Sequence, residues 1–146
     1  MLQQPSQQKA IRPENAYTVV VEDTQQNFAY VGGQLHSMGV RALDWKTSGY
    51  QVVMLAEKLP NISLIMMNIS LPYEDGYQAI QKIRAHSRLK DTIVCAVTTK
   101  VTASEEEMLK AQDSGFDGFL VKPFHNDHFP EQIRRLLSGE SVWMWQ

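Results

Sequence analysis

Several features that mark particular classes of protein are scarce in this sequence of 146 residues. It contains one cysteine, Cys95, so it cannot form an internal disulfide, and nothing in it indicates an oxidising compartment. No run of roughly 18 or more apolar residues occurs, which argues against a membrane-spanning helix. The polar, Gln-rich start of the chain has no apolar stretch that could serve as a secretory signal. We therefore expect a cytoplasmic protein with no membrane partner.

The sequence also lacks a large excess of charge of either sign. Its formal net charge is −2, and its isoelectric point lies near 6.1. Proteins that bind nucleic acid or anionic lipid usually carry a basic patch that neutralises phosphates. We therefore expect no nucleic-acid binding by this chain. What is present is a 43% share of hydrophobic residues, which is typical of one globular domain.

Strand and helix patterns alternate five times along the chain. The strand patterns are short β-branched or apolar runs, and the helix patterns repeat apolar residues every three or four positions. Such an alternation favours a parallel sheet that is covered by helices on both faces. The predicted strands cover residues 17–21, 40–45, 62–67, 92–97 and 118–121, and the predicted helices lie near residues 28–38, 52–59, 76–85, 102–114 and 129–137.

The two ends of the chain lie outside this alternation. Residues 1–15 show no hydrophobic periodicity and are predicted to form a flexible N-terminal extension. Residues 16–138 are predicted to form the domain. Residues 139–146 form a C-terminal tail that contains Trp143 and Trp145. This tail either packs back on the domain or forms an exposed apolar patch for a partner, and the sequence favours neither alternative.

Polar residues follow four of the predicted strands. Glu22 and Asp23 come directly after the first strand, and Asn68 follows the third. Thr98 and Lys122 follow the fourth and the fifth. In a parallel α/β sheet, ligands bind outside the carboxyl ends of the strands. We therefore expect these side chains to share one mouth at that edge of the sheet.

The segments that carry these residues resemble the receiver domain of two-component response regulators, over nearly all of residues 17–137. Residues 19–23, Val-Val-Val-Glu-Asp, resemble the first strand of the family with its acidic pair, and residues 65–76 resemble its phosphoacceptor segment. Residues 95–98 are similar to its fourth strand with a hydroxyl residue, and residues 119–124 to its lysine motif. Each motif is weak alone, but the four in this order are specific. The resemblance implies a single doubly wound, flavodoxin-like α/β domain with five helices and a five-stranded parallel sheet of order 2-1-3-4-5.

The resemblance also implies a role for each residue in the mouth. In an active receiver, two acidic side chains and the acceptor carboxylate hold Mg²⁺, and a lysine offsets the charge of the transferred phosphoryl group. By resemblance, Asp23 is the direct metal ligand, Glu22 is the more distant acid, and the carbonyl of Ser70 completes the set. Thr98 corresponds to the hydroxyl switch residue, and Lys122 to the cation.

Further implications of the resemblance concern conformation and contacts. Phe119 corresponds to the aromatic residue whose rotamer reports the signalling state, and the bond between Lys122 and Pro123 is often cis in this family. Many receivers form homodimers or bind partners through the fourth helix, fifth strand and fifth helix. The resemblance therefore implies this face for a homodimer or a partner, and it implies a histidine kinase or a downstream effector as the signalling partner.

Asn68 departs from the family pattern, because it stands where the phosphoacceptor aspartate is expected. A carboxamide is neutral, is a poor nucleophile and is a weaker metal ligand than a carboxylate. We therefore expect a degenerate pseudo-receiver that is not an enzyme and acts as a phosphorylation-independent interaction module. No cofactor is required, and Glu22, Asp23 and Ser70 are expected to bind Mg²⁺ weakly at most. The lost like charge predicts stability without Mg²⁺.

Two other functions are alternatives to this one. The first is a phosphoaccepting receiver in which Asn68 was introduced artificially or in which another acceptor is used. Glu74 and Asp75 lie in the following loop, and we do not expect them to replace the strand-end acceptor, because in-line attack has a fixed geometry. The second is a nucleotide-binding enzyme of the same topology. It is disfavoured because no Gly-rich phosphate loop follows the first predicted strand.

Overall fold

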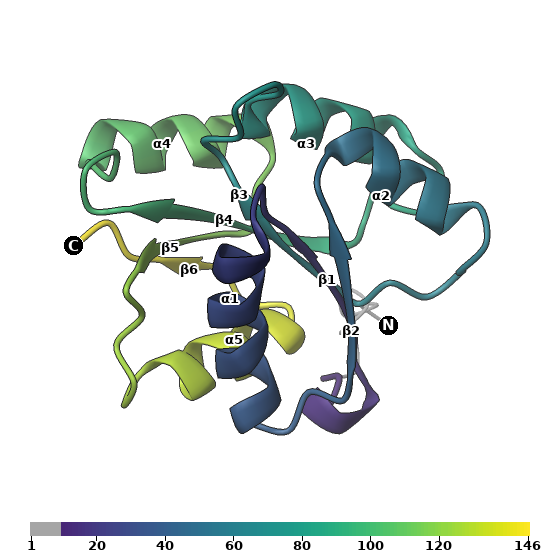
Figure 1. The fold of residues 1–146 in the computed structure, drawn as a ribbon, viewed down its shortest axis with the longest axis horizontal. Helices are drawn as coiled ribbons and strands as arrows, with labels where there is room; N and C mark the ends of the chain where they lie inside the picture. Colours follow the sequence, from purple (N-terminus) through teal and green to yellow (C-terminus); the bar gives the residue numbers. More distant parts are fainter. Residues whose placement is uncertain (1–9) are drawn as a thin grey trace, which may run out of the picture.

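Strands and helices alternate along the chain in the computed structural model, which describes residues 10–146 (Figure 1). The strands are β1 (Tyr17–Val21), β2 (Ala42–Lys46), β3 (Leu64–Asn68), β4 (Ile93–Thr99), β5 (Gly118–Lys122) and β6 (Val142–Trp143). The α-helices are α1 (Gln25–Ser37), α2 (Gly49–Ala56), α3 (Gly76–Ala85), α4 (Glu105–Ser114) and α5 (Phe129–Leu137).

All six strands are parallel and lie in the order β2-β1-β3-β4-β5-β6. The predicted parallel sheet with five helices is therefore confirmed, but the predicted count of five strands was wrong. The sixth strand comes from the tail, where Val142 and Trp143 pair with Gly118 and Phe119 of β5. A strand of two residues is too short to show an alternating pattern in the sequence, so only its docking on β5 defines it.

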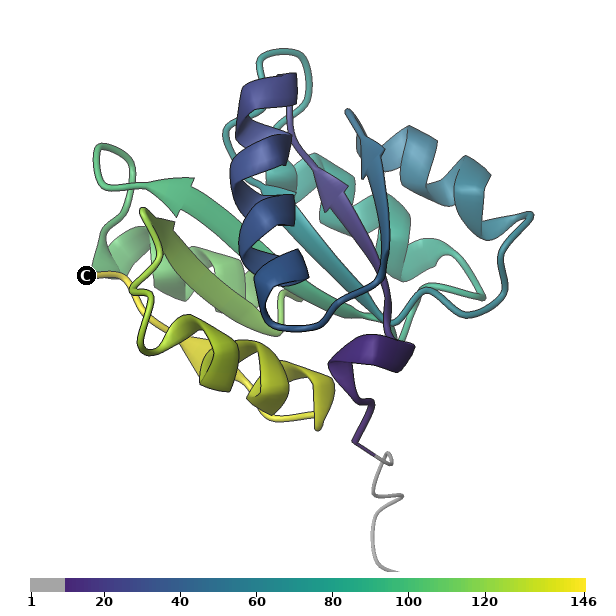
Figure 2. The same ribbon diagram turned by 60° about the horizontal axis from the view of Figure 1, so that its bottom comes forward.

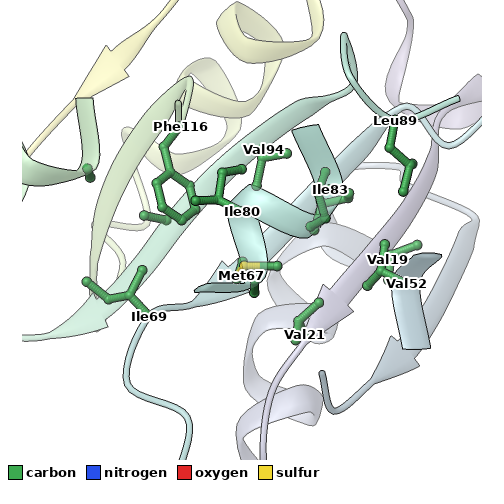
Figure 3. Close-up of a cluster of buried hydrophobic side chains, with 14 of the residues drawn as sticks. Val19, Val21, Val52, Met67, Ile69, Ile80, Ile83, Leu89, Val94 and Phe116 are labelled. Carbon is green, nitrogen blue, oxygen red and sulfur yellow. The ribbon is translucent and has the colours of Figure 1, made fainter. Parts of the chain in front are cut away.

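Helices cover both faces of the sheet, α2, α3 and α4 on one face and α1 and α5 on the other (Figures 1 and 2). Successive residues of a strand point to opposite faces. Val19 and Val21 accordingly enter the core under α2, α3 and α4, which Figure 3 shows, whereas Val20 enters the core under α1 and α5. Because both faces are buried, the strands are continuous apolar runs in the sequence.

Side-chain caps start four of the helices shortly after the strands end. Each cap accepts a hydrogen bond from the backbone N–H three residues further on, which satisfies one of the free donors in the first turn. The capping residues are Thr24 for α1, Ser48 for α2, Asp75 for α3 and Ser104 for α4. The Ser48 cap places the start of α2 at Gly49, earlier than the apolar pattern from residue 52 predicted.

The segments that flank the central domain both contact it. Residues 1–9 of the predicted N-terminal extension lie outside the described residues, whereas Pro13–Asn15 form a 3-10 helix. The backbone N–H of Ile11 donates to the carbonyl of Leu137 at 3.0 Å, which ties this segment to the end of α5. The tail packs back on the domain, since Trp143 and Trp145 pack against the α2–α4 core. No helix among residues 10–146 is long and apolar enough to cross a membrane.

Candidate functional site

The polar residues that follow the strands meet at the carboxyl edge of the sheet. An open pocket there is lined by Asp23, Asn68, Ser70, Thr98 and Lys122, together with residues from α1. Strand register brings them together, because Asn68 pairs with Val97 on β4, and Thr99 pairs with Lys122 on β5. Four of the five residues that the strand ends predicted, Asp23, Asn68, Thr98 and Lys122, therefore line one pocket.

Glu22 lies beneath this pocket with only 1% of its surface exposed, and both of its carboxylate oxygens are occupied. Its Oε1 accepts a hydrogen bond from Asn68 Nδ2 at 2.8 Å. Its Oε2 accepts one from Lys122 Nζ at 2.9 Å, which is also an ion pair. The Glu22 backbone is held as well, because its carbonyl accepts from Trp45 Nε1 at 2.8 Å. A buried carboxylate is tolerated when it is paired in this way.

The Asn68 amide uses both of its ends in the same network. While its Nδ2 donates to Glu22, its Oδ1 accepts from the backbone N–H of Ser70 at 2.7 Å. An ionised aspartate at this position would have no hydrogen to donate. The contact between Asn68 and Glu22 would then become a repulsion between two carboxylates. The amide therefore supplies the donor that Glu22 needs at this point.

A Mg²⁺ ion needs several oxygen ligands, and a carboxylate is the usual protein contribution. Asp23 lines the pocket, and its Oδ1 accepts from Asn27 Nδ2 at 3.2 Å. Of the predicted metal-binding side chains, only Asp23 has a carboxylate oxygen without a hydrogen-bond partner among residues 10–146, because both oxygens of Glu22 are occupied. Residues 10–146 contain no cluster of three or more His, Cys, Asp or Glu side chains arranged for a metal. These side chains, as they are arranged, do not fit a Mg²⁺ site.

Thr98 differs from its neighbours in the pocket, because its hydroxyl is unpaired. The residue is 1% exposed, and its Oγ1 has no hydrogen-bond partner among the described residues. A buried hydroxyl without a partner costs on the order of 1–3 kcal/mol. Phe119, the predicted conformational reporter, is fully buried in the α2–α4 core. The pocket thus holds one free buried hydroxyl, beside a carboxylate that is fully engaged.

The two acidic residues of the loop after β3 are engaged elsewhere. Glu74 is buried, and its Oε1 accepts from the backbone N–H of Gly49 at 2.7 Å, while Oε2 pairs with Lys82. Asp75 caps α3 by accepting from the backbone N–H of Gln78 at 2.8 Å. Neither lines the pocket. Their roles are to fix the loop against α2 and to start α3.

Three residues that line the pocket were missed in the sequence, namely Asn27, Tyr30 and Thr99. Asn27 and Tyr30 are three apart on α1 and so share a helix face, which was the available signal. The hydroxyl of Tyr30 accepts from the backbone N–H of Phe124 at 2.7 Å. This bond ties α1 to the loop after β5, which begins with the cis Lys122–Pro123 bond that the resemblance implied.

The tail alters the face that was predicted for a homodimer or a partner. That face includes β5, but β6 pairs along the outer side of β5. The backbone N–H of Met144 also donates to the carbonyl of Phe119 at 2.9 Å. The tail therefore covers the edge of β5 at Gly118 and Phe119, and the rest of β5 up to Lys122 stays at the edge of the sheet.

Comparison with known proteins agrees with this geometry. Residues 18–134 match the family model of the response regulator receiver domain. The chain belongs to this family. As a receiver domain of two-component signalling, it is similar to proteins of two kinds, histidine kinases and response regulators.

Three relatives illustrate the range of this similarity. The signal transduction histidine-protein kinase BarA of Escherichia coli is 30% identical over 87% of the chain, which spans only 14% of that kinase. The two-component response regulator ORR5 of Oryza sativa is 27% identical, over 84% of the chain and 86% of ORR5. The solved receiver domain of sensor histidine kinase PA1611 from Pseudomonas aeruginosa has a TM-score of 0.69 and 27% identity. The match covers 86% of this chain and 98% of that one, which has a magnesium ion coordinated in its active site cleft.

Proposed function

We propose that this receiver domain signals by binding a protein partner, without accepting a phosphoryl group and without requiring Mg²⁺. The observation that carries the proposal is the closed network around Glu22, in which Asn68 and Lys122 occupy both carboxylate oxygens. In an active receiver, these positions serve the metal and the incoming phosphoryl group. In this protein the side chains at these positions bond to one another, and Lys122 balances the buried charge of Glu22.

The lack of an acceptor supports the same conclusion. The Asn68 amide is a poor nucleophile, and its oxygen already accepts from Ser70. Glu74 and Asp75, the acidic residues nearest in the sequence, are held by Gly49 and by the start of α3. We therefore propose that the domain is not an enzyme and that any binding of Mg²⁺, through Asp23, is weak.

The partner that we propose is a histidine kinase or a downstream effector of a two-component pathway. Family membership and the similarity to histidine kinases such as BarA and to the regulator ORR5 support this class of partner. The activity of the whole kinases is not carried over, because the chain matches only a small part of them. A cytoplasmic location stays a prediction from the sequence.

Intact-mass spectrometry after incubation with acetyl phosphate or phosphoramidate and Mg²⁺ tests the proposal. We expect no change in the mass of the natural sequence, because it has no acceptor carboxylate at the strand end. A gain of one phosphoryl mass would overturn the proposal. The Asn68→Asp variant is the matched control. Labelling of that variant alone assigns the loss of phosphotransfer to Asn68, and no labelling of either protein means that other parts of the site have also changed.

One observation favours the alternative of a phosphoaccepting receiver. The free hydroxyl of Thr98 lies in the pocket where a phosphoryl oxygen would give it a partner. In this alternative, Asn68 was introduced in place of aspartate or another acceptor is used. The test compares phosphoryl labelling of Asn68→Asp with labelling of the Asn68→Asp, Thr98→Val double variant. Weaker labelling of the double variant supports the alternative. Equal labelling of the two means that the Thr98 hydroxyl does not contact the phosphoryl group.

A further inference from the structure

Helix α2 is unusually apolar for a helix at the surface. Its eight residues, Gly-Tyr-Gln-Val-Val-Met-Leu-Ala, include no charged side chain, and Gln51 is the only amide. A helix that is apolar all round is normally buried, whereas a surface helix has a polar outer face. Val52 and Ala56 are buried in the core, but Tyr50 is 62% exposed and Met54 is 48% exposed. The outer face of α2 is therefore apolar, and nothing within residues 10–146 covers it.

The place of α2 in the fold leaves this face open. On one side α2 packs closely on α3, since an added Cβ at Gly49 would lie 2.9 Å from the Cβ of Ala79. On the other side α2 ends its layer of helices beside the edge strand β2 (Figure 1). Tyr73 is 61% exposed, and its hydroxyl donates at 2.7 Å to the carbonyl of Thr47, in the turn that leads into α2. Tyr73 thus extends the apolar face of α2.

A groove of ≈ 470 Å³ lies between α2 and the edge of the sheet, and we call it the α2 groove. Apolar side chains and two lysines share its lining, which consists of Trp45, Lys46, Thr47, Gln51, Met54, Leu55 and Lys58. No acidic residue lines it. The groove therefore combines apolar walls with two ammonium groups.

The charges at the α2 groove indicate what kind of segment it accepts. Lys58 is exposed and forms no ion pair within residues 10–146. Lys46 Nζ lies 3.8 Å from Asp44 Oδ1, so it is only loosely paired. The carboxylate of Glu57 contacts His86 at 2.8 Å and does not line the groove. An acidic segment would complement these two lysines, and complementary charge favours one partner over others.

The α2 groove also adjoins the backbone that holds Glu22 in place. Trp45 Nε1 donates to the carbonyl of Glu22 at 2.8 Å, and the carbonyl of Lys46 accepts from the N–H of Glu22 at 3.1 Å. Trp45 and Lys46 both line the groove. A segment bound there would therefore rest on two residues that fix the Glu22 backbone.

We propose that the α2 groove is the docking surface for an acidic segment of a partner protein, one that carries at least two carboxylates beside a large apolar side chain. The apolar side chain enters the groove beside Met54, and the carboxylates pair with Lys46 and Lys58. The inference rests on the proposed function and deepens it, because it gives the binding surface and the chemistry of the partner. This surface lies at the opposite end of the sheet from the β5 face that the resemblance implied.

Selection of random peptides displayed on phage against the full chain tests the proposal. We expect the selected peptides to be acidic and to share a large apolar residue. Their affinity, measured by fluorescence anisotropy, should fall roughly tenfold or more in Lys58→Glu and in Met54→Glu. Lys100→Glu is the matched control, because it reverses the charge of an exposed lysine that does not line the groove. This variant should bind the peptides like the natural sequence.

Backbone chemical shifts of the natural sequence give a second measurement that needs no variant. The selected peptides should shift the resonances of α2 and β2. No enrichment of peptides, enrichment of basic peptides, or shifts that lie away from α2 overturn the proposal. So does an affinity that Lys58→Glu leaves intact or that Lys100→Glu lowers equally.

Vesicles that contain phosphatidylglycerol separate a protein partner from a membrane surface. We expect the natural sequence not to bind them. Vesicle binding that Lys58→Glu abolishes would assign the groove to an anionic membrane and overturn the proposal. The proposed function can fail separately, because a gain of one phosphoryl mass by the natural sequence contradicts it without changing the binding of peptides to the α2 groove.

Discussion

The pocket at the carboxyl edge of the sheet has two halves, which differ in whether their buried polar groups have hydrogen-bond partners. On the β1 side, Glu22 has a partner for each of its oxygens, in Asn68 and Lys122. On the β4 side, the Thr98 hydroxyl has no hydrogen-bond partner among the described residues. Both residues are 1% exposed, so burial does not explain the difference.

Asn68 accounts for part of this difference in hydrogen bonding, because it contacts Glu22. Asn68 donates to Glu22 and accepts from the backbone N–H of Ser70, and it makes no hydrogen bond with Thr98. The asparagine therefore completes the hydrogen bonding of Glu22 and leaves the Thr98 hydroxyl unaffected. In this account the ion pair and hydrogen bond of Glu22 stabilise the pocket, and the unpaired Thr98 hydroxyl does not.

The largest loss of stability should come from removing Lys122, the cation that pairs with Glu22. Lys122→Met leaves the buried Glu22 carboxylate without its ion pair and should lower the free energy of unfolding by about 3–5 kcal/mol. Urea unfolding at neutral pH measures it. Lys100→Met, a change of an exposed lysine near the same edge, is the control and should have little effect. Equal stability of Lys122→Met and the natural protein would show that the pair is not holding the site.

A smaller effect is expected from restoring the carboxylate. Asn68→Asp replaces the donor to Glu22 with a second negative charge and should lower the free energy of unfolding, in metal-free buffer, by about 1–3 kcal/mol. Asn61→Asp makes the same change at an exposed position and is the control. If the two variants are equally stable without metal, the hydrogen bond between Asn68 and Glu22 has no bearing on stability.

The smallest change in stability is expected from a substitution at Thr98. Thr98→Val removes a hydroxyl that has no partner, so stability should stay constant or rise by up to about 1 kcal/mol. Thr18→Val is a matched comparison, because Thr18 on β1 is also fully buried with an unpaired hydroxyl, outside the pocket. Both variants should behave alike. A clear loss of stability in Thr98→Val alone would mean that its hydroxyl is satisfied by water in solution.

The location of the site could be predicted from the sequence because it depends on strand ends. Parallel strands bring their carboxyl ends to one edge, so the order of Glu22, Asn68, Thr98 and Lys122 was enough to place them together. The hydrogen bonds between them were not predictable. Nothing in the sequence gives the direction of the Asn68 amide, and residues 22 and 122 are a hundred positions apart. Such contacts depend on the packing of the whole sheet.

The tail shows a second limit of the sequence. Its Trp residues suggested an apolar contact but gave no choice between packing back and exposure. The choice depends on Gly118, where the absence of a side chain leaves room for the Val142 carbonyl. Similarly, the role of Glu74 as a partner of the Gly49 backbone needs the close approach of the β3–α3 loop to α2, which no local pattern reveals.

The central claim is that the Asn68 amide and Lys122 make the Glu22 carboxylate independent of a metal ion. Thermal melting with and without Mg²⁺, for the natural sequence and for Asn68→Asp, tests it most directly. The account predicts no change in Tm for the natural sequence and a clear rise for Asn68→Asp, in which a divalent cation would relieve the repulsion between carboxylates. A strong rise in the Tm of the natural sequence on addition of Mg²⁺ would contradict it.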